Sequence, residues 1–257
     1  MSYQTIQVRR SEGIAHVTLA NKDRDNAINE TMLSELHAVL DAVQHDNDCR
    51  LIVLRGQEEC FCTGMDIREL AAHYDPQTLS QGGKQFWDLM HRIVTLPKIT
   101  IALVDGRVSA GGVGIVAACD LVLASKRSQF SLPEALWGLL PCCVLPFLGR
   151  RIGFQKAYSL MLTTQTIKSD EAHRLHLVDE LSDEPERAVK KHLNRIGNLN
   201  AQTIKDMKQF AHRLWPISEA SETVALQEYT RLLSSQTVVG NIKTFVEHGL
   251  FPWEKSN

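Results

Sequence analysis

Residues 99–114 read ITIALVDGRVSAGGVG and combine an apolar run, a glycine turn and a cluster of small residues. The first six residues have the length and the β-branched content of a buried strand. The chain turns at Gly106, and the small residues Ala110-Gly111-Gly112 are placed to open a helix. Several glycines so close together let another group approach the backbone. The segment therefore predicts a strand, a loop and a helix N-terminus in succession.

The same pattern extends on both sides of this segment. Residues 14–19, 50–55 and 121–124 are further apolar runs that predict strands, and helical stretches separate them. Asn29 is placed to cap a helix with a single apolar face. That face consists of Met32, Leu33, Leu36, Val39, Leu40 and Val43. Strands that alternate with helices predict an α/β fold with mostly parallel pairing.

From residue 183 onward the sequence predicts helices and no strand. The predicted helices span residues 186–196, 201–213, 219–233 and 238–248, with Gly249 at a C-terminal cap position. We therefore divide the chain into a core, 1–195, and an all-helical region, 196–257. The apolar faces of these helices need a partner, which is either the core or another subunit.

Composition excludes several classes of function. The 257 residues include 28 basic and 30 acidic ones, so net charge gives no reason to expect binding to nucleic acid or to a membrane surface. No apolar run approaches the length of about 18 residues that a membrane span needs, and no signal peptide is recognisable, so we expect a cytoplasmic protein. The six cysteines lack zinc-site spacing, so we expect free thiols and no metal.

A second strand-to-helix loop accompanies the one at Gly111. Residues 59–70 read ECFCTGMDIREL, in which Gly64 lies in the loop and a helix begins near Asp66. Helix N-termini present free backbone N–H groups. One N–H from each loop could converge on a single oxygen as an oxyanion hole, in which each donor contributes about 3–4 kcal/mol to a transition state. The alternative is that both are ordinary strand-to-helix turns.

The third segment, residues 130–146, reads FSLPEALWGLLPCCVLP. Pro133 suits the first turn of a short helix, with Glu134 beside it. The apolar residues near Glu134 in sequence are Phe130, Leu132, Leu136, Trp137 and Leu139. Such surroundings should raise the pKa of the Glu134 carboxyl, as general acid/base work requires. The alternative is a helix-N-terminal glutamate that faces water.

In order and spacing, the three segments resemble the enoyl-CoA hydratase/isomerase (crotonase) superfamily. The resemblance extends over nearly the whole chain, to Phe251-Pro-Trp253-Glu254. It implies a spiral core of ββα units and a C-terminal helical region that mediates trimers, often dimers of trimers. It also implies that Met65 and Gly111 supply the two oxyanion-hole N–H groups.

The sequence departs from family hydratases at one catalytic position. Those enzymes carry a glutamate two residues after the glycine run, where this chain has Gly114. The second family glutamate, at the Pro-Glu position, is present as Glu134. Simple hydration of crotonyl-CoA is therefore not expected. The remaining carboxylate is suited to moving a proton at the carbon beside a thioester carbonyl.

Within the superfamily the chain most resembles the discrete dehydratases of polyketide β-branching cassettes. Residues 110–114, 130–153 and 251–254 carry this resemblance. It implies dehydration of 3-hydroxy-3-methylglutaryl–acyl carrier protein to 3-methylglutaconyl–carrier protein, which a sister crotonase would then decarboxylate. No cofactor is implied beyond the phosphopantetheine of the carrier protein or of coenzyme A.

Three other functions stay open at this point. A Δ3,Δ2-enoyl-CoA isomerase would use the same single glutamate and the same oxyanion hole. An enoyl-CoA hydratase of acyl-CoA metabolism and a non-catalytic RNA-binding scaffold are the other two. The absence of basic tracts, the glycine loops and the retained Glu134 argue against the scaffold.

The substrate of the dehydratase carries a second, distal carboxylate, and a buried charge needs a partner. Candidate partners are Lys84, His91, Arg107, Arg150, Arg151 and His248. For each of them the alternative is a solvated surface charge. Further substrate-binding candidates are Gly64, Asp66, Gly112, Gly114 and Trp137. A basic patch beside the channel entrance would suit an acidic carrier protein.

Overall fold

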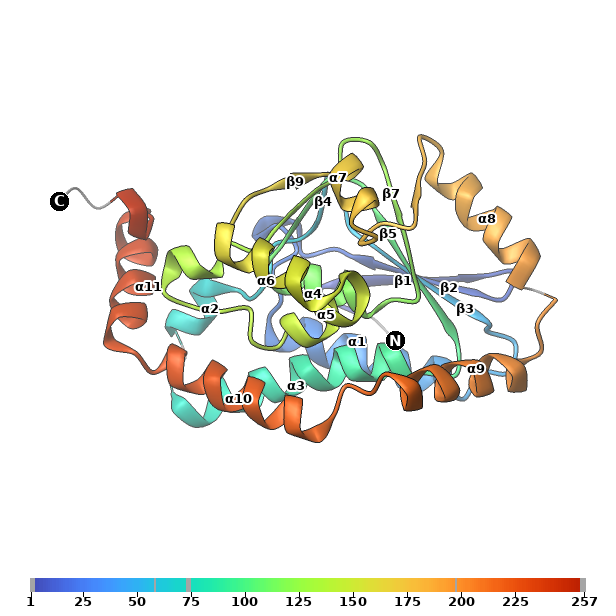
Figure 1. Cartoon of the computed structure of the whole chain (residues 1–257), viewed down its shortest axis with the longest axis horizontal. Coiled ribbons are helices and arrows are strands. Elements are labelled where there is room, and N and C mark those ends of the chain that lie inside the picture. Colours follow the sequence, from blue (N-terminus) through green and yellow to red (C-terminus); the bar gives the residue numbers. More distant parts are fainter. Residues whose placement is uncertain (1–2, 58, 73–74, 197, 255–257) are drawn as a thin grey trace.

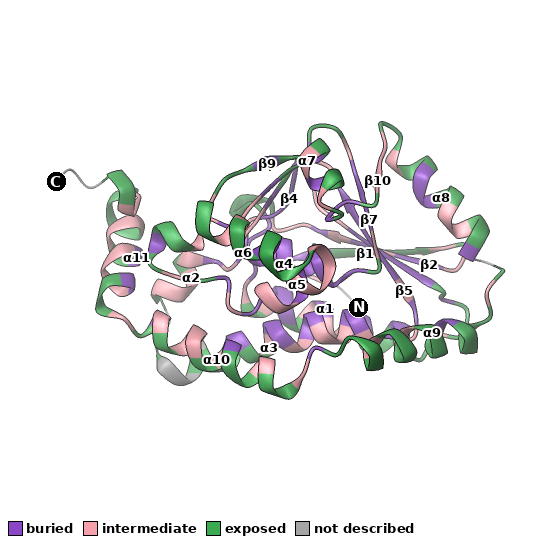
Figure 2. Ribbon diagram, viewed as in Figure 1, coloured by how far each residue is buried: buried purple, intermediate pink, exposed green. Residues whose placement is uncertain are grey.

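The computed structural model describes residues 3–57, 59–72, 75–196 and 198–254. Two sheets cross in the centre of the molecule, and helices surround them (Figure 1). Buried residues concentrate in the strands and in the helices packed against them (Figure 2). None of the described helices has the length and apolar character that crossing a bilayer requires.

The larger sheet contains the strands that the sequence predicts. In spatial order it comprises β1 (Ile6–Ser11), β2 (Ile14–Leu19), β3 (Leu51–Arg55), β5 (Ile99–Val104), β7 (Leu121–Ala124) and β10 (Glu180–Leu181). All neighbours pair in parallel except β1 and β2, which form an antiparallel hairpin. The expected parallel α/β arrangement is confirmed. Strand β1 was not predicted, since this edge strand, IQVRRS, is largely polar.

The smaller sheet consists of very short strands, which were not predicted from the sequence. In spatial order they are β4 (Cys60–Cys62), β6 (Arg107–Ser109), β8 (Gln129–Ser131) and β9 (Ile167–Lys168). The first three each follow a strand of the larger sheet and precede a helix. Each such succession is one ββα unit, so the expected spiral of ββα units is confirmed.

Helices surround the two sheets of the core. They are η1 (Lys22–Arg24), α1 (Glu30–Gln44), α2 (Ile67–Ala72), α3 (Pro76–Thr95), α4 (Gly111–Ala118), η2 (Glu134–Trp137), α5 (Leu145–Ile152), α6 (Phe154–Thr163) and α7 (Ser169–Arg174). Asn29 caps α1 as predicted, because its side chain accepts from the Met32 N–H at 2.8 Å. The six residues of the predicted apolar face of α1 are all buried.

The C-terminal part is helical as predicted. It contains α8 (Pro185–Ile196), α9 (Ala201–Leu214), α10 (Glu219–Leu233), α11 (Gln236–His248) and η3 (Pro252–Glu254). Gly249 ends α11 with φ +69°. Helix α10 packs on α3, and α11 packs on α2 (Figure 1).

The proposed division at 195/196 lies one residue before the end of α8. Residues 1–2, 58, 73–74, 197 and 255–257 of the two ranges lie outside the described part. Ile217 and Ala225 belong to the same apolar cluster as the central strands. The helical region therefore shares its core with the spiral. Its expected role in forming trimers stays a prediction.

Candidate active site

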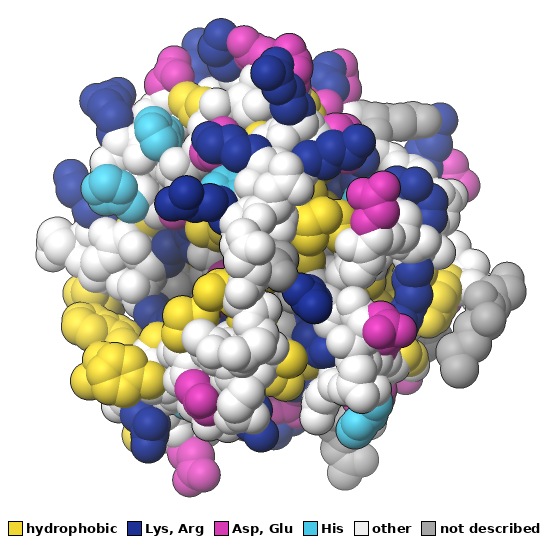
Figure 3. Space-filling model, turned by 90° about the vertical axis from the view of Figure 1, so that its right-hand side faces the viewer, with side chains coloured by type: hydrophobic (Ala, Val, Ile, Leu, Met, Phe, Trp, Pro, Cys, Tyr) yellow, Lys and Arg dark blue, Asp and Glu magenta, His cyan; other side chains and the backbone are white. Residues whose placement is uncertain are grey.

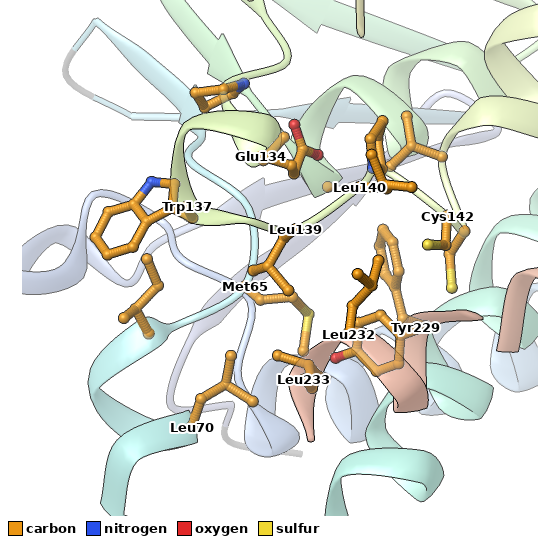
Figure 4. A pocket seen from close by; sticks show the side chains of 18 of the residues that line it. Met65, Leu70, Glu134, Trp137, Leu139, Leu140, Cys142, Tyr229, Leu232 and Leu233 are labelled. Carbon is orange, nitrogen blue, oxygen red and sulfur yellow. The ribbon is translucent and has the colours of Figure 1, made fainter. Parts of the chain in front are cut away.

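A cavity lies between the loops of the spiral core and helix α10 (Figure 4). Its walls are mostly apolar and include Met65, Leu70, Leu139 and Leu233. Among the described residues that line it, Glu134 is the one acidic side chain, and none is Lys, Arg or His. An apolar cavity with one carboxyl group is suited to proton transfer on a bound acyl chain.

The two strand-to-helix loops lie directly against each other in this cavity. A Cβ atom built on Gly64 would come within 2.6 Å of Ala110 Cβ and 3.1 Å of the Gly111 nitrogen. The first loop is also held by Ile28, whose N–H donates to the Gly64 carbonyl at 2.7 Å and whose carbonyl accepts from the Asp66 N–H at 2.9 Å. Gly64 therefore allows the close approach and does not itself line the cavity.

Two backbone N–H groups are free at the meeting point of the loops. Met65 and Gly111 both line the cavity. Neither N–H donates to any of the hydrogen bonds found among the described residues. Gly111 is the first residue of α4, whose initial N–H groups have no partner within the helix. The structure thus brings together the two donors that the sequence singled out.

Ala110, between these loops, has a strained backbone. Its φ of +49° lies in a region that L-residues other than glycine rarely adopt. Its N–H donates to the Ser131 carbonyl at 3.0 Å, and its carbonyl accepts from Val113 at 2.9 Å. Such conformations cost about 1–3 kcal/mol and persist where the surroundings fix them. Here the conformation sets where the Gly111 N–H is placed.

Glu134 begins the one-turn helix η2 directly after Pro133, as expected. Its Oε2 is buried, and no described residue donates to it. Burial raises the pKa of this carboxyl from 4.5 to about 8, against a weaker opposing effect of its own backbone N–H. The expected rise in pKa is confirmed, and the alternative of a glutamate that faces water is wrong.

The surroundings of Glu134 differ in part from those expected. Trp137 and Leu139 line the cavity with it (Figure 4). Phe130 and Leu132 are buried in the core and do not line the cavity, and Leu136 is exposed. A one-turn helix points successive side chains in different directions. Closeness in sequence therefore overstated the number of apolar side chains around Glu134.

Gly114 occupies the position of the second glutamate of family hydratases. A Cβ atom built there would lie 2.7 Å from Met90 Sδ and 3.0 Å from Val144 Cγ2. This part of the structure has no room for a carboxylate side chain. At Gly112 a Cβ would lie 2.6 Å from the Cys62 carbonyl oxygen, so that glycine allows α4 to pack on β4. Neither glycine lines the cavity, so the structure gives no support to a direct substrate contact from either.

The other candidate contacts also have structural roles. Asp66 is buried and caps α2, because its side chain accepts from the N–H groups of Arg68 at 2.9 Å and Glu69 at 3.2 Å. Trp137 forms part of the cavity wall and contacts the rings of Phe245, Phe251 and Trp253. Of these two residues, only Trp137 is placed to touch a ligand beside Glu134.

None of the six candidate partners for a distal carboxylate lines the cavity that contains Glu134. Lys84 pairs with Asp88 and Glu222, and Arg107 pairs with Asp25. The exposed His248 lies at the end of α11.

The remaining three cations also lie outside the cavity lining. The ring of His91 contacts that of His212. Arg151 donates to the carbonyls of Leu177 and Cys119 and pairs with Asp179. Burial lowers the pKa of the nearby Arg150, which lies outside the cavity lining.

Sequence reasoning missed the wall contributed by helix α10. Tyr229, Leu232 and Leu233 line the cavity about 95 residues after Glu134 in the chain. The sequence showed only the apolar periodicity of a helix there, and that pattern does not tell which element the helix will cover. Tyr229 is notable because its hydroxyl is buried and has no hydrogen-bond partner among the described residues.

The cysteines behave as buried thiols. Cys142 and Cys143 line the cavity, and burial raises the pKa of each thiol to about 12, so neither is a thiolate at neutral pH. The six cysteines form no disulfide. No cluster of three or more metal-ligating side chains occurs among the described residues.

Charge is mixed over the surface. On the face shown in Figure 3, Lys and Arg side chains are interspersed with Asp and Glu. A basic docking patch beside the channel entrance stays a prediction.

Comparisons with known proteins agree with this arrangement. The sequence matches the family model described as enoyl-CoA hydratase/isomerase over residues 9–256. The bacillaene synthase dehydratase PksH of Bacillus subtilis (strain 168) is 37% identical over 261 residues, which cover 99% of this chain and 98% of that protein. The short-chain-enoyl-CoA hydratase of Clostridium acetobutylicum is 29% identical over 221 residues, 83% of each chain.

Solved structures show the same fold. The crystal structure of PksH from Bacillus subtilis, described as a polyketide biosynthesis enoyl-CoA hydratase, has a TM-score of 0.90 at 35% identity and covers 98% of this chain and 100% of that one. An enoyl-CoA hydratase/isomerase from Xanthobacter autotrophicus Py2 has a TM-score of 0.89 at 22% identity, covering 97% and 95%. The chain therefore belongs to the enoyl-CoA hydratase/isomerase (crotonase) family.

Proposed function

We propose that this protein is a dehydratase that converts 3-hydroxy-3-methylglutaryl–acyl carrier protein to 3-methylglutaconyl–acyl carrier protein. The observation that carries the proposal is the buried Glu134 carboxyl in one cavity with the free N–H groups of Met65 and Gly111. The similarity to the bacillaene synthase dehydratase over nearly the whole chain supports a hydro-lyase of polyketide biosynthesis.

The thioester carbonyl oxygen accepts hydrogen bonds from the N–H groups of Met65 and Gly111. The carboxylate form of Glu134 removes a proton from C2. The C2–H electron pair forms a double bond between C2 and the carbonyl carbon, and the carbonyl π pair moves onto the oxygen to give an enolate. The two donors stabilise this developing charge, an effect worth about 3–4 kcal/mol per donor in enzymes of this type. The pKa of about 8 makes Glu134 a stronger base than an exposed glutamate.

The second half of the reaction expels the C3 hydroxyl. Glu134, now protonated, gives its proton to that oxygen, the C3–O bond breaks, and water leaves as the C2–C3 double bond forms. In a syn elimination the C2 proton and the C3 hydroxyl leave from the same face of the substrate, so one carboxyl group can reach both. A single glutamate therefore completes the cycle, and the space around Gly114 leaves no room for a second.

The substrate is bound to a carrier, and the protein assembles as a trimer or as a dimer of trimers. Phosphopantetheine would present the thioester at the two N–H groups, whether it belongs to a carrier protein or to coenzyme A. The product is a vinylogue of a malonyl thioester, because its distal carboxymethyl group is joined to the thioester through the C2–C3 double bond. A second crotonase-type enzyme would decarboxylate it, since loss of CO2 leaves a stabilised dienolate.

The test is incubation of the protein with 3-hydroxy-3-methylglutaryl–carrier protein, followed by mass spectrometry of the carrier. Loss of one water from the acyl group is the expected result, and unchanged acyl mass would refute the proposal. Incubation with a 3-enoyl thioester separates the alternative isomerase, since isomerisation changes the position of the double bond without any change in mass. Glu134→Gln is the inactive control for both reactions.

A further inference from the structure

Three buried side-chain atoms lack a hydrogen-bond partner among the described residues. They are Glu134 Oε2, the Tyr229 hydroxyl oxygen and His212 Nδ1. The first two line the same cavity, whereas His212 lies outside it beside His91. A buried hydroxyl without a partner is unfavourable, so its presence in a cavity points to a ligand that supplies the partner.

The position of the Tyr229 ring is fixed by the fold. Tyr229 lies on α10, which packs on α3, and a Cβ atom built on Gly83 of α3 would lie 2.7 Å from both Cδ1 and Cε1 of the ring. Gly83 thus leaves the space that the ring fills. Burial also raises the pKa of the Tyr229 hydroxyl, so it remains a proton donor at every physiological pH.

Tyr229 and Glu134 approach the cavity from different sides. Figure 4 shows Glu134 entering from the η2 loop and Tyr229 from α10, with Met65 between them. If the C3 hydroxyl of the substrate faces Glu134, the other substituents of that tetrahedral carbon point away from it. A substituent that extends toward the α10 wall would meet the Tyr229 hydroxyl, the polar side-chain atom that this wall offers.

The cavity contains no cation that could take a distal carboxylate instead, since no described lining residue is Lys, Arg or His. Among these residues Tyr229 and Thr63 are the ones with hydroxyl groups. A hydroxyl that donates to a carboxylate makes a hydrogen bond about twice as strong as one between neutral groups. Tyr229 is therefore the best-placed partner for a negatively charged end of the acyl chain.

We propose that the Tyr229 hydroxyl binds the distal carboxylate of the acyl chain and so selects substrates that carry one. This inference rests on the proposed dehydratase function. It makes Tyr229 a specificity-determining residue that contacts a part of the substrate remote from proton transfer at C2.

The test compares two carrier-bound substrates that differ only at C3. One is 3-hydroxy-3-methylglutaryl–carrier protein, and the other is 3-hydroxy-3-methylbutyryl–carrier protein, in which a methyl group replaces the carboxymethyl group. Wild type is expected to prefer the first. Tyr229→Phe should lower kcat/KM for the first by about 10- to 100-fold, the size expected for one hydrogen bond to a charged group, and change the second by less than about 2-fold.

Tyr158→Phe is the matched control, since Tyr158 is exposed on α6 outside the cavity. The melting temperature of Tyr229→Phe should equal or exceed that of wild type, because the lost hydroxyl had no protein partner. A structural role would instead lower it and reduce turnover of both substrates alike.

Three results would overturn the inference. They are equal losses of kcat/KM with both substrates, no loss with the carboxylated one, and a wild-type enzyme that does not distinguish the two. If wild type dehydrates neither substrate, the proposed function itself fails, and the inference fails with it.

Discussion

Replacing Glu134 with Gln should abolish dehydration and, at the same time, make the protein more stable than wild type as the pH rises. The amide has nearly the shape of the carboxyl group but cannot act as a base. It also cannot ionise, so it avoids the unfavourable burial of a carboxylate. The two effects have opposite signs, and together they distinguish a catalytic group from a structural one.

The magnitude follows from the pKa of the buried carboxyl, which burial raises from 4.5 to about 8. Because the native state holds its proton up to higher pH than the unfolded state, this group's contribution to stability is fully present below pH 4.5. It is lost as the pH rises from there to about 8. The loss is about 1.4 kcal/mol per pH unit, hence about 3 kcal/mol by pH 7. Water that enters the cavity solvates the carboxylate and makes this loss of stability smaller.

Urea unfolding of Glu134→Gln and wild type at pH 5, 6, 7 and 8 measures the effect, with tryptophan fluorescence as the probe and a fixed protein concentration. The difference in unfolding free energy between the two should grow steadily with pH. Glu247→Gln, at an exposed position of α11, is the matched control and should show no such growth. Turnover of the carrier-bound substrate is measured on the same preparations.

Either of two results would refute the reasoning. A difference in unfolding free energy that stays constant from pH 5 to pH 8 would show that the Glu134 carboxyl is not buried in solution. Turnover by Glu134→Gln near the wild-type rate would show that another group moves the proton.

Three further outcomes are expected from the same site. For dehydration by wild type, kcat/KM should rise about tenfold per pH unit and level off above about pH 8, because only the carboxylate form of Glu134 removes the C2 proton. A flat profile of kcat/KM from pH 6 to 8 would contradict this. Gly64→Ala would place a Cβ 2.6 Å from Ala110 Cβ at a φ of +93°, so initial-rate assays should show kcat lowered by about 100-fold or more. The control Gly240→Ala, which has open space around the new Cβ, should leave kcat unchanged. Gly114→Glu should not create enoyl-CoA hydration in a spectrophotometric assay, and it should lower the melting temperature through overpacking against Met90.

The strands and helices with strong periodicity were predictable from sequence. The buried strand at residues 99–104 and the six apolar residues of α1 were found because a single physical signal, repeated burial of one face, dominates there. The three-residue strands of the smaller sheet were missed, since three residues cannot show a period. Their pairing depends on the register of neighbouring units, which is a property of the assembled spiral.

Sequence reasoning found those parts of the site whose function depends on local backbone conformation. Gly64 and Gly111 stand out in sequence because close approach requires glycine, and Glu134 stands out beside Pro133. The cations chosen for the distal carboxylate do not line the cavity, because a charge in sequence says nothing of its partners. Lys84, for example, is held by Asp88 and Glu222. Tyr229 was missed because tertiary packing of α10 on α3 brings it to the cavity.

Specificity for the acyl chain and the chemistry of proton transfer depend on different elements of this fold. Tyr229, Leu232 and Leu233 are spaced at i, i+3 and i+4, so they form one stripe on a single helix face. The proton-transfer group and the two N–H donors belong to residues 65–134, on other elements. Substitutions along that stripe can therefore change the size and polarity of the accepted acyl group while the reaction chemistry is inherited unchanged. New specificities within this family could arise by exchange of three side chains on one helix.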